Sequence, residues 1–244
     1  MITWSKEYYK SQLPHQCQRY YDHLLSGFLS MKEHIIFPYP SVKADDISNA
    51  LYAATLDHPE VFWVDGYDGY TCFSGPVYST LRIKNFFSNS DISRWKSEAE
   101  MWRQRVCSQI PPSSDDYKKI WLLYDYLARQ VTYGYSEMKY SQTIIGCLKK
   151  GFHRSVCEGI AKSFKYLCDH AGVNCIVIPG KLLVNGIYIG HAWNLVEYGQ
   201  GIYHIDVTDA LEYAKLYRKA DDRRFLKPSG EMSGYIWDNS FKIP

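Results

Sequence analysis

Apolar side chains recur at helical spacing over the first part of the chain. Between Ser5 and Glu33 they fall at Tyr9, Leu13, Tyr20, Leu24 and Phe28, which is the period of one helix face. Pro14 lies inside this pattern and must interrupt or restart the helix, because proline lacks an N–H group and clashes with the preceding turn. The pattern therefore predicts an interrupted helix that ends before the stretch FPYP at 37–40.

The remainder of the first half mixes helical and strand patterns. A second, short helix is predicted over Asp45–Leu56. The apolar run Val61–Val64 favours a strand that leads into a turn at Asp65–Gly69, and Val77–Phe86 favours another strand. Ile92–Ile110 is amphipathic and charged, which is typical of a surface helix.

A boundary is predicted near Pro111. The stretch PPSSDD ends the preceding helix and supplies N-cap residues for the next, Tyr117–Gln130. No low-complexity segment or internal repeat divides the chain further. We therefore expect a mainly helical N-terminal subdomain, 1–110, and a second domain, 111–244, that carries the candidate chemistry.

One helix of the second half has complete start and stop signals. After an irregular loop predicted over Tyr133–Lys150, Ser155 and Glu158 have the spacing of a capping box, and Gly172 has the place of a C-terminal glycine cap. An apolar stripe lies between these signals, formed by Ile160, Phe164, Leu167, Cys168 and Ala171. These signals place Cys157 in the first turn of the helix.

Beyond this helix the apolar pattern changes to that of short strands. The runs are separated by Pro-Gly, Asn-Gly and Gly-Gln-Gly, and they read NCIVIPG, KLLV, IYIG, HAWNLVEY and IYHIDVT. A helix followed by an antiparallel meander predicts an α+β fold.

The composition narrows the classes of binding partner and the cellular compartment expected for the protein. Lysine plus arginine (28) and aspartate plus glutamate (26) leave a net charge of +2 with no basic run, which argues against a nucleic-acid partner. The start, MITWSKEYYK, lacks the apolar core of a secretory signal, and no run of about 18 apolar residues predicts a membrane span. Seven scattered cysteines fit reduced thiols. Together these features predict a cytoplasmic protein.

The predicted position of Cys157 suits a nucleophile. A free thiol, with a pKa of about 8.5, is mostly protonated at neutral pH, and the thiolate is the reactive form. The first turn of a helix offers unpaired N–H groups and the positive end of the helix dipole. These favour a thiolate and can also hold an oxyanion.

The last predicted hairpin brings a histidine and a carboxylate together. If Gly199 and Gln200 form a two-residue turn, Asp206 lies opposite Trp193, and His191 is its diagonal neighbour on the same face. A histidine base held by a carboxylate is the partner that a cysteine nucleophile needs. Cys157, His191 and Asp206 are therefore the candidate catalytic triad.

Other residues compete for these roles. His204 shares a face with Asp206 and can replace His191, whereas Asp209 replaces Asp206 only if a bulge shifts the register. A zinc site built from the cysteines at 157, 168 and 175 with a histidine is disfavoured, because the chain has neither CxxC nor HExxH. Neither a metal nor another cofactor is expected.

These stretches resemble a known family. VCEGIAKSFKYLCDHAGVNCIVIPG, GHAWNLV and YHIDVT, in this order within 117–212, resemble the catalytic core of transglutaminase-like proteins, including bacterial cysteine proteases and amidases. The resemblance implies a papain-like α+β core in which the nucleophile helix packs on an antiparallel sheet. It implies Cys157 as nucleophile, His191 as general base and acid, and Asp206 as the residue that orients it. The chain is too short for the additional calcium-binding domains of animal members, so calcium dependence is not expected.

The side-chain donor of the oxyanion hole is less defined. Gln142, in the loop before the cysteine helix, is the candidate because its amide N–H can donate to an oxyanion. Residues 1–110 carry no part of the resemblance.

The expected activity is acyl transfer on an amide bond of a peptide, protein or peptidoglycan-type substrate. Hydrolysis is preferred over amine cross-linking, because water is the default acceptor. The alternatives from other classes are a non-catalytic module that binds a peptide or glycan in a groove lined by some of the 22 tyrosines, and an interaction protein that works through its N-terminal half.

Overall fold

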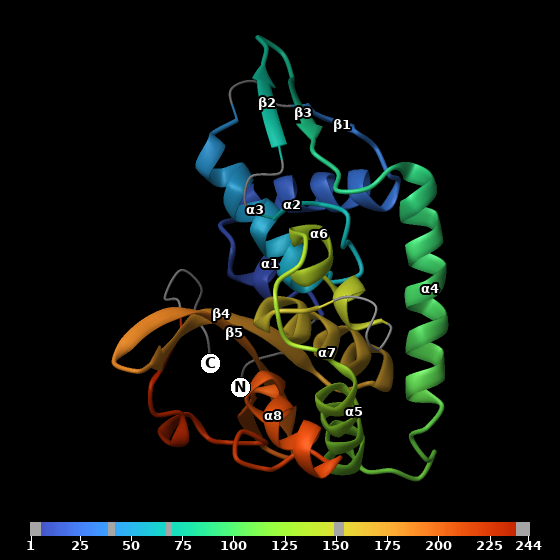
Figure 1. Cartoon of the computed structure of the whole chain (residues 1–244). Helices are drawn as coiled ribbons and strands as arrows, with labels where there is room; N and C mark the ends of the chain where they lie inside the picture. The colour runs from blue at the N-terminus through green and yellow to red at the C-terminus, as the bar shows by residue number, and fades with distance from the viewer. Residues whose placement is uncertain (1–5, 39–41, 67–69, 149–153, 238–244) are drawn as a thin grey trace. The chain divides into compact units, whose positions relative to one another are not determined.

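The computed structural model (Figure 1) describes residues 6–38, 42–66, 70–148 and 154–237. The chain divides into two compact units. We call Glu7–Arg94 the N-terminal unit and the chain from Trp95 the C-terminal unit. The division falls within helix α4 (Asn89–Cys107), ahead of the boundary predicted near Pro111. The functional boundary at Pro111 stays a prediction.

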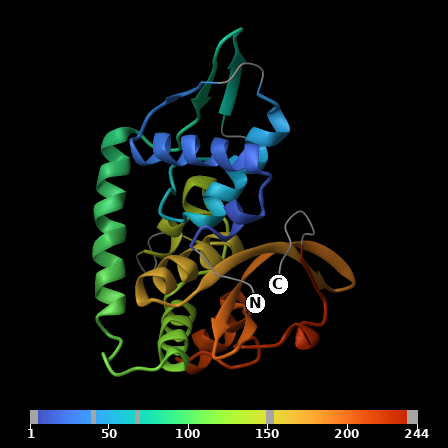
Figure 2. The ribbon, with the colours of Figure 1, turned by 180° about the vertical axis from the view of Figure 1, so that it is seen from behind.

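The N-terminal unit combines three helices with a small antiparallel sheet of strand order β1-β3-β2. Its elements are α1 (Tyr8–Gln12), α2 (His15–Leu29), β1 (His34–Phe37), α3 (Ala44–Asp57), β2 (Tyr70–Ser74) and β3 (Ser79–Ile83). Helix α2 packs against α3 and β1 (Figure 2). The predicted interruption at Pro14 is confirmed, because Pro14 is the N-cap residue of α2.

One strand prediction in this unit is wrong. Val61–Val64 form no strand, and only Val64 makes an isolated bridge, to Asn85. All four side chains are buried, so the apolar run fills the core from an irregular segment, which a pattern of burial cannot distinguish from a strand. The turn predicted at Asp65–Gly69 lies partly outside the described residues.

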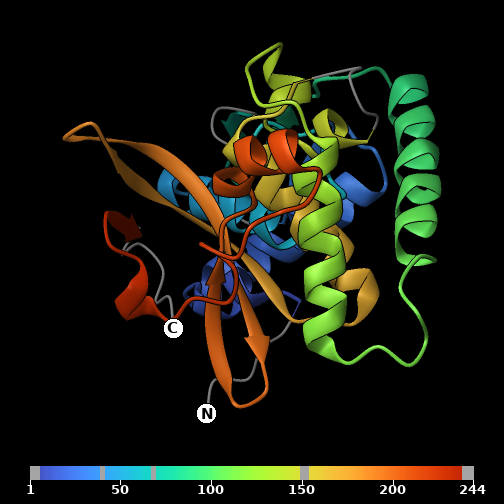
Figure 3. The ribbon, with the colours of Figure 1, turned by 60° about the horizontal axis from the view of Figure 1, so that its bottom comes forward.

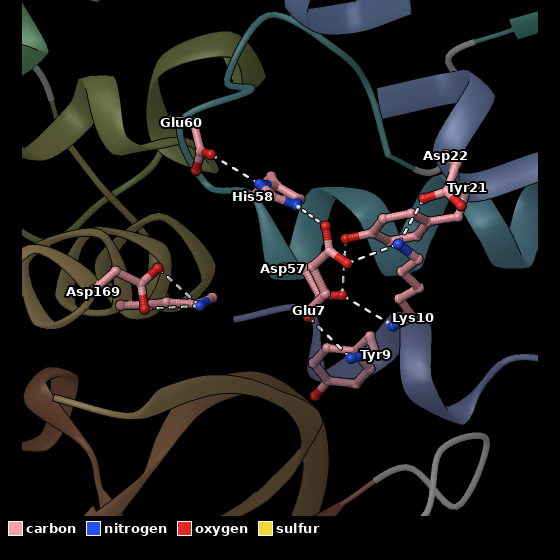
Figure 4. A network of polar contacts seen from close by, with 10 residues as sticks. Glu7, Tyr9, Lys10, Tyr21, Asp22, Asp57, His58, Glu60 and Asp169 are labelled. Carbon is pink, nitrogen blue, oxygen red and sulfur yellow. Dashed lines mark hydrogen bonds and ion pairs between the residues drawn. The ribbon is translucent and has the colours of Figure 1, made fainter. Parts of the chain in front are cut away.

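A buried carboxylate connects the three helices of the N-terminal unit (Figure 4). Asp57, the last residue of α3, accepts hydrogen bonds from the backbone N–H groups of Tyr9 and Lys10, both at 3.0 Å, and from the Tyr21 hydroxyl at 3.1 Å. Two unpaired N–H groups of the short helix α1 thereby find a charged acceptor. Asp57 acts as a cap supplied by another helix.

Helix α5 (Asp116–Gln130) begins as predicted, with the Asp115 side chain accepting from the Lys118 N–H at 2.8 Å. The C-terminal part of α4 packs beside α5 and the next long helix, because Trp102 donates to the Tyr126 hydroxyl at 3.1 Å and stacks on Tyr166. The loop predicted over 133–150 contains two short helical turns, α6 (Met138–Ser141) and η1 (Ile144–Cys147).

The C-terminal unit is a helix followed by an antiparallel meander, as predicted. Its further elements are α7 (Cys157–Ala171), β4 (Cys175–Val184), β5 (Ile187–Tyr198), β6 (Gly201–Ile205), α8 (Val207–Tyr217), η2 (Ser229–Glu231) and β7 (Tyr235–Trp237). The sheet order is β6-β5-β4-β7. Helix α7 packs on β4 and β5, and α5 packs on α7 and α8 (Figure 1). This arrangement of mixed helix and antiparallel sheet is an α+β fold.

The five predicted strand runs merge into three strands. β4 continues through Pro179 and Gly180, and β5 continues through Gly190. Gly180 marks a close approach rather than a turn, since a Cβ atom there would lie 2.4 Å from the Ile236 carbonyl oxygen and 2.6 Å from the Trp193 ring. Across the described ranges, no helix has both the length and the apolar character needed to cross a bilayer.

Candidate active site

Cys157 is the first residue of α7, and its side chain is half-buried. The predicted capping box is wrong. Val156 is the N-cap residue without a side-chain cap, because the buried Ser155 hydroxyl donates to the Ser141 carbonyl at 3.1 Å, and Glu158 pairs with Lys162 at 2.7 Å. The predicted glycine cap is confirmed, with Gly172 left-handed at φ 74. The N–H groups of the first turn thus receive no side-chain cap from Val156.

The segment that carries Gln142 lies against this first turn. The Val156 N–H donates to the Ser141 carbonyl at 3.0 Å. At Gly159 a Cβ atom would lie 2.4 Å from the Ser141 oxygen and 2.9 Å from the Thr143 oxygen, so only glycine permits this approach. Gln142 is half-buried between these two contact points, and its role as an oxyanion donor stays a prediction.

His191 and Asp206 form the predicted pair. Tyr198 lies opposite Gly201 and Asn194 opposite Ile205, which is the register expected from the two-residue turn. His191 Nε2 lies 2.7 Å from Asp206 Oδ2, and both side chains are buried. Asp206 also caps α8, because its Oδ1 accepts from the Thr208 N–H at 2.9 Å.

The pKa of His191 reports what surrounds the ring. Burial lowers it, but hydrogen bonds to Asp206 and to Cys157, together with the charges of both groups, raise the pKa to about 10. Because Nε2 contacts Asp206, Nδ1 is the ring nitrogen that Asp206 does not occupy. The structure therefore places His191 against Asp206, with Cys157 close enough to raise the pKa of the ring.

Tyr235 is a partner that the sequence did not indicate. Its hydroxyl donates to Asp206 Oδ2 at 2.8 Å, and its ring lies 5.8 Å from that of His191. Burial, followed by the charge of Asp206, raises the pKa of Tyr235. β7 positions it opposite Leu182 of β4. As one of 22 tyrosines in a short strand with no distinctive pattern, Tyr235 had no signal in the sequence.

Tyr133 is a second unpredicted neighbour. Its backbone bridges to Ser155, with the Ser155 N–H donating to Thr132 and the Gly134 N–H donating to Ser155, both at 3.1 Å. Burial raises the pKa of Tyr133, as do the charge of Cys157 and a hydrogen bond to its side chain, while a backbone hydrogen bond from Cys157 opposes the shift. The phenol of Tyr133 therefore lies close enough to Cys157 for the thiol to influence its pKa.

The two rival residues occupy other positions. His204 is fully buried, accepts from Trp193 Nε1 on Nδ1 at 2.9 Å, and bonds through Nε2 to the Ser229 hydroxyl at 3.0 Å. Burial lowers its pKa to about 4, so the ring is neutral with both nitrogens engaged. Asp209 lies in α8, 3.8 Å from Arg223, and burial raises its pKa. Asp206 thus pairs with His191 and not with His204.

The cysteines and the potential metal ligands of the described residues form no further cluster. All seven cysteines are free thiols. The described residues contain no group of three or more His, Cys, Asp or Glu side chains arranged to hold a metal ion.

Comparisons with known proteins give a distant similarity in fold. No protein-family model and no curated protein matches this chain. A solved structure described as that of a TGase is similar in fold, with a TM-score of 0.41 and 13% sequence identity over 72% of this chain. The chain spans about half of that structure, 50% of its length. A similarity of this size assigns neither family nor activity, so the geometry of the site is the basis for a function.

Proposed function

We propose that this protein is a transglutaminase-like cysteine enzyme that transfers the acyl group of an amide bond, with hydrolysis as its main reaction. The observation that carries the proposal is the position of His191, which is hydrogen-bonded to Asp206 at 2.7 Å and lies close enough to Cys157 for the thiol to raise the pKa of the imidazole. The sequence resemblance over 117–212 supports the same three residues.

Each residue has a defined part in the proposed reaction. The Cys157 sulfur, its proton taken by His191, attacks the amide carbonyl carbon, and the carbonyl oxygen becomes an oxyanion near the Cys157 N–H. His191 returns the proton to the amide nitrogen, the C–N bond breaks, and an amine leaves behind a thioester. His191 then takes a proton from water, whose oxygen attacks the thioester carbonyl, and the returning proton restores the thiol. Asp206 holds the imidazole in orientation throughout.

The first test is the pH dependence of Cys157 alkylation by iodoacetamide, read site by site through peptide mass spectrometry. Cys72, half-buried in strand β2, is an internal reference thiol. We expect Cys157 to react at about pH 6, where free thiols are mostly protonated, at least about tenfold faster than Cys72. His191→Ala should reduce the alkylation rate of Cys157 to that of Cys72. Equal rates for Cys157 and Cys72 in the native chain would contradict the proposed triad.

Hydrolysis and cross-linking differ in their products. Incubation with a peptide library should yield cleaved or deamidated peptides, and a labelled primary amine should enter few of them. Cys157→Ser is the control that should lose both products. Label incorporation that exceeds hydrolysis would favour amine transfer over water.

A further inference from the structure

Strand β5 has an open edge next to His191. β6 pairs with β5 only from Asn194 to Tyr198, and the other side of β5 is paired with β4 from Ile187 to Val196. In the part of the chain that the structure describes, residues 187–193 have no strand partner on the β6 side. The open edge therefore begins where the candidate site is.

The register identifies which backbone groups face this edge. Val184 and Ile187 flank the two-residue turn Asn185–Gly186, which has positive φ at both positions, so this pair exchanges both of its hydrogen bonds. The odd-numbered residues of β5 then face β4. The N–H and C=O groups of Tyr188 and Gly190 point to the open edge, and no hydrogen bond to them is found in the described residues.

The side chains around this edge are apolar and exposed. The β4–β5 hairpin extends beyond the helices of its unit (Figure 3), and its exposed apolar residues are Leu183, Val184, Ile187, Tyr188 and Ile189. Proteins usually protect such an edge with charges, proline or a covering element, because it can pair with another chain. Gly190 adds no obstacle, since a Cβ atom there would meet nothing within 4 Å.

We propose that the open edge of β5 binds the substrate as an added strand, so that the substrate is an extended, apolar stretch of polypeptide. This inference rests on the proposed function and names its substrate class. Main-chain hydrogen bonds to Tyr188 and Gly190 hold the peptide backbone, and its alternate side chains lie on the face that Ile187 and Ile189 share with His191. A bound strand thereby delivers a backbone amide to the position beside the imidazole.

The test uses peptides of alternating valine and threonine, acetylated and amidated at their ends, six residues long. The probe is saturable protection of Cys157 from iodoacetamide, and binding of a fluorescent version is followed by anisotropy. Methylating the backbone nitrogens on one edge of the peptide should weaken binding about tenfold, because the added strand loses its donors. Equal binding of the methylated and unmethylated peptides would overturn the proposal. This test needs no change to the protein.

Two matched variants test the protein side. Gly190→Pro removes an N–H group that β4 does not use, whereas Gly190→Ala keeps it. We expect about tenfold weaker peptide binding for the proline variant and native-like binding for the alanine variant. Tyr188→Pro, which removes another outward N–H group, should repeat the loss.

The outcomes separate this proposal from the function on which it rests. Native-like binding by both proline variants would overturn it. If Cys157 is inert but the anisotropy still shows edge binding that depends on Gly190, the proposed chemistry fails and the peptide site stands. If Cys157 is reactive and no peptide binds, the proposed chemistry stands and the peptide site fails.

Discussion

Each unit contains a buried aspartate that accepts a hydrogen bond from a tyrosine and lies near a histidine. In the N-terminal unit, Asp57 accepts from two backbone N–H groups and from Tyr21 (Figure 4). In the C-terminal unit, Asp206 accepts from His191, from Tyr235 and from one backbone N–H group. The two carboxylates are similar in burial and in the kinds of donor they receive.

The two aspartates differ in the other contact of the histidine that lies beside each of them. His58 follows Asp57 in the chain, but its ring bonds to Glu60 at 2.8 Å, and the groups on Asp57 belong to the start of α1 and to α2. The histidine on Asp206 instead lies close enough to a thiol for Cys157 to raise its pKa. A buried, well-bonded carboxylate is therefore a structural feature by itself, and chemistry requires that its histidine also contact a nucleophile.

Asn substitution of the two aspartates should give opposite results. Asp206→Asn should lower peptide cleavage about 10³-fold or more, because the amide cannot stabilise the imidazolium. Asp57→Asn should leave cleavage within about twofold and lower the free energy of unfolding by about 2–4 kcal/mol, because it weakens three bonds to a buried charge. Cleavage assays and urea denaturation of both variants measure this.

The distinction between the two aspartates is contradicted if Asp57→Asn, at temperatures where it stays folded, loses cleavage activity as severely as Asp206→Asn. Asp206 would then have no distinct place in the reaction.

The two histidines should both affect stability, but only one should affect reactivity. Burial lowers the pKa of His58, yet the hydrogen bond and charge of Glu60 give a net raised value, and the pKa of His191 is also raised. A raised pKa means that the protonated ring stabilises the fold. This contribution is complete below the ordinary pKa of 6.5. It is lost as the pH rises through the folded pKa, by on the order of 1 kcal/mol for each pH unit between the two pKa values.

His58→Gln should therefore flatten the decline in stability above neutral pH and leave the pH profile of Cys157 alkylation unchanged. His191→Gln should flatten the decline and also change the alkylation profile. Denaturation and alkylation series over the same pH range separate the two. A changed alkylation profile in His58→Gln would contradict the assignment.

The smallest effects are expected at the two tyrosines. Tyr21→Phe and Tyr235→Phe each remove one hydroxyl from a buried carboxylate and should lower the free energy of unfolding by about 1–3 kcal/mol. Without the Tyr235 donor, Asp206 becomes a stronger acceptor for His191, so the pKa of the imidazole should rise further.

NMR titration of the histidine rings measures this change in pKa, with Tyr21→Phe as the matched control. The predicted effect of Tyr235 on the Asp206–His191 pair is refuted if both variants move the His191 titration alike or leave it in place.

Local signals explain most of what the sequence predicted correctly. The register of His191 and Asp206 follows from the two-residue turn at Gly199, and the end of α7 follows from the left-handed Gly172. These features depend on residues close in sequence, where turn and cap preferences are strong.

The errors and omissions come from distant contacts. Ser155 fails as a cap because the remote Ser141 carbonyl takes its hydroxyl, and Val61–Val64 are buried without forming a strand. Tyr133 and Tyr235 reach the site from other segments that carry no pattern of their own. Packing decides such contacts, and neither periodicity nor spacing records it.

The hairpin of β5 and β6 also bears on how the chain folds. His191 and Asp206 are 15 residues apart and joined through one tight turn, so their pairing has low contact order, and hairpins of this kind close in about 1–10 μs. Cys157 reaches them only after α7 docks on the sheet. We therefore expect the histidine and carboxylate to meet early in folding and the thiol to join them last, so that the reactive centre is completed only with the tertiary structure around it.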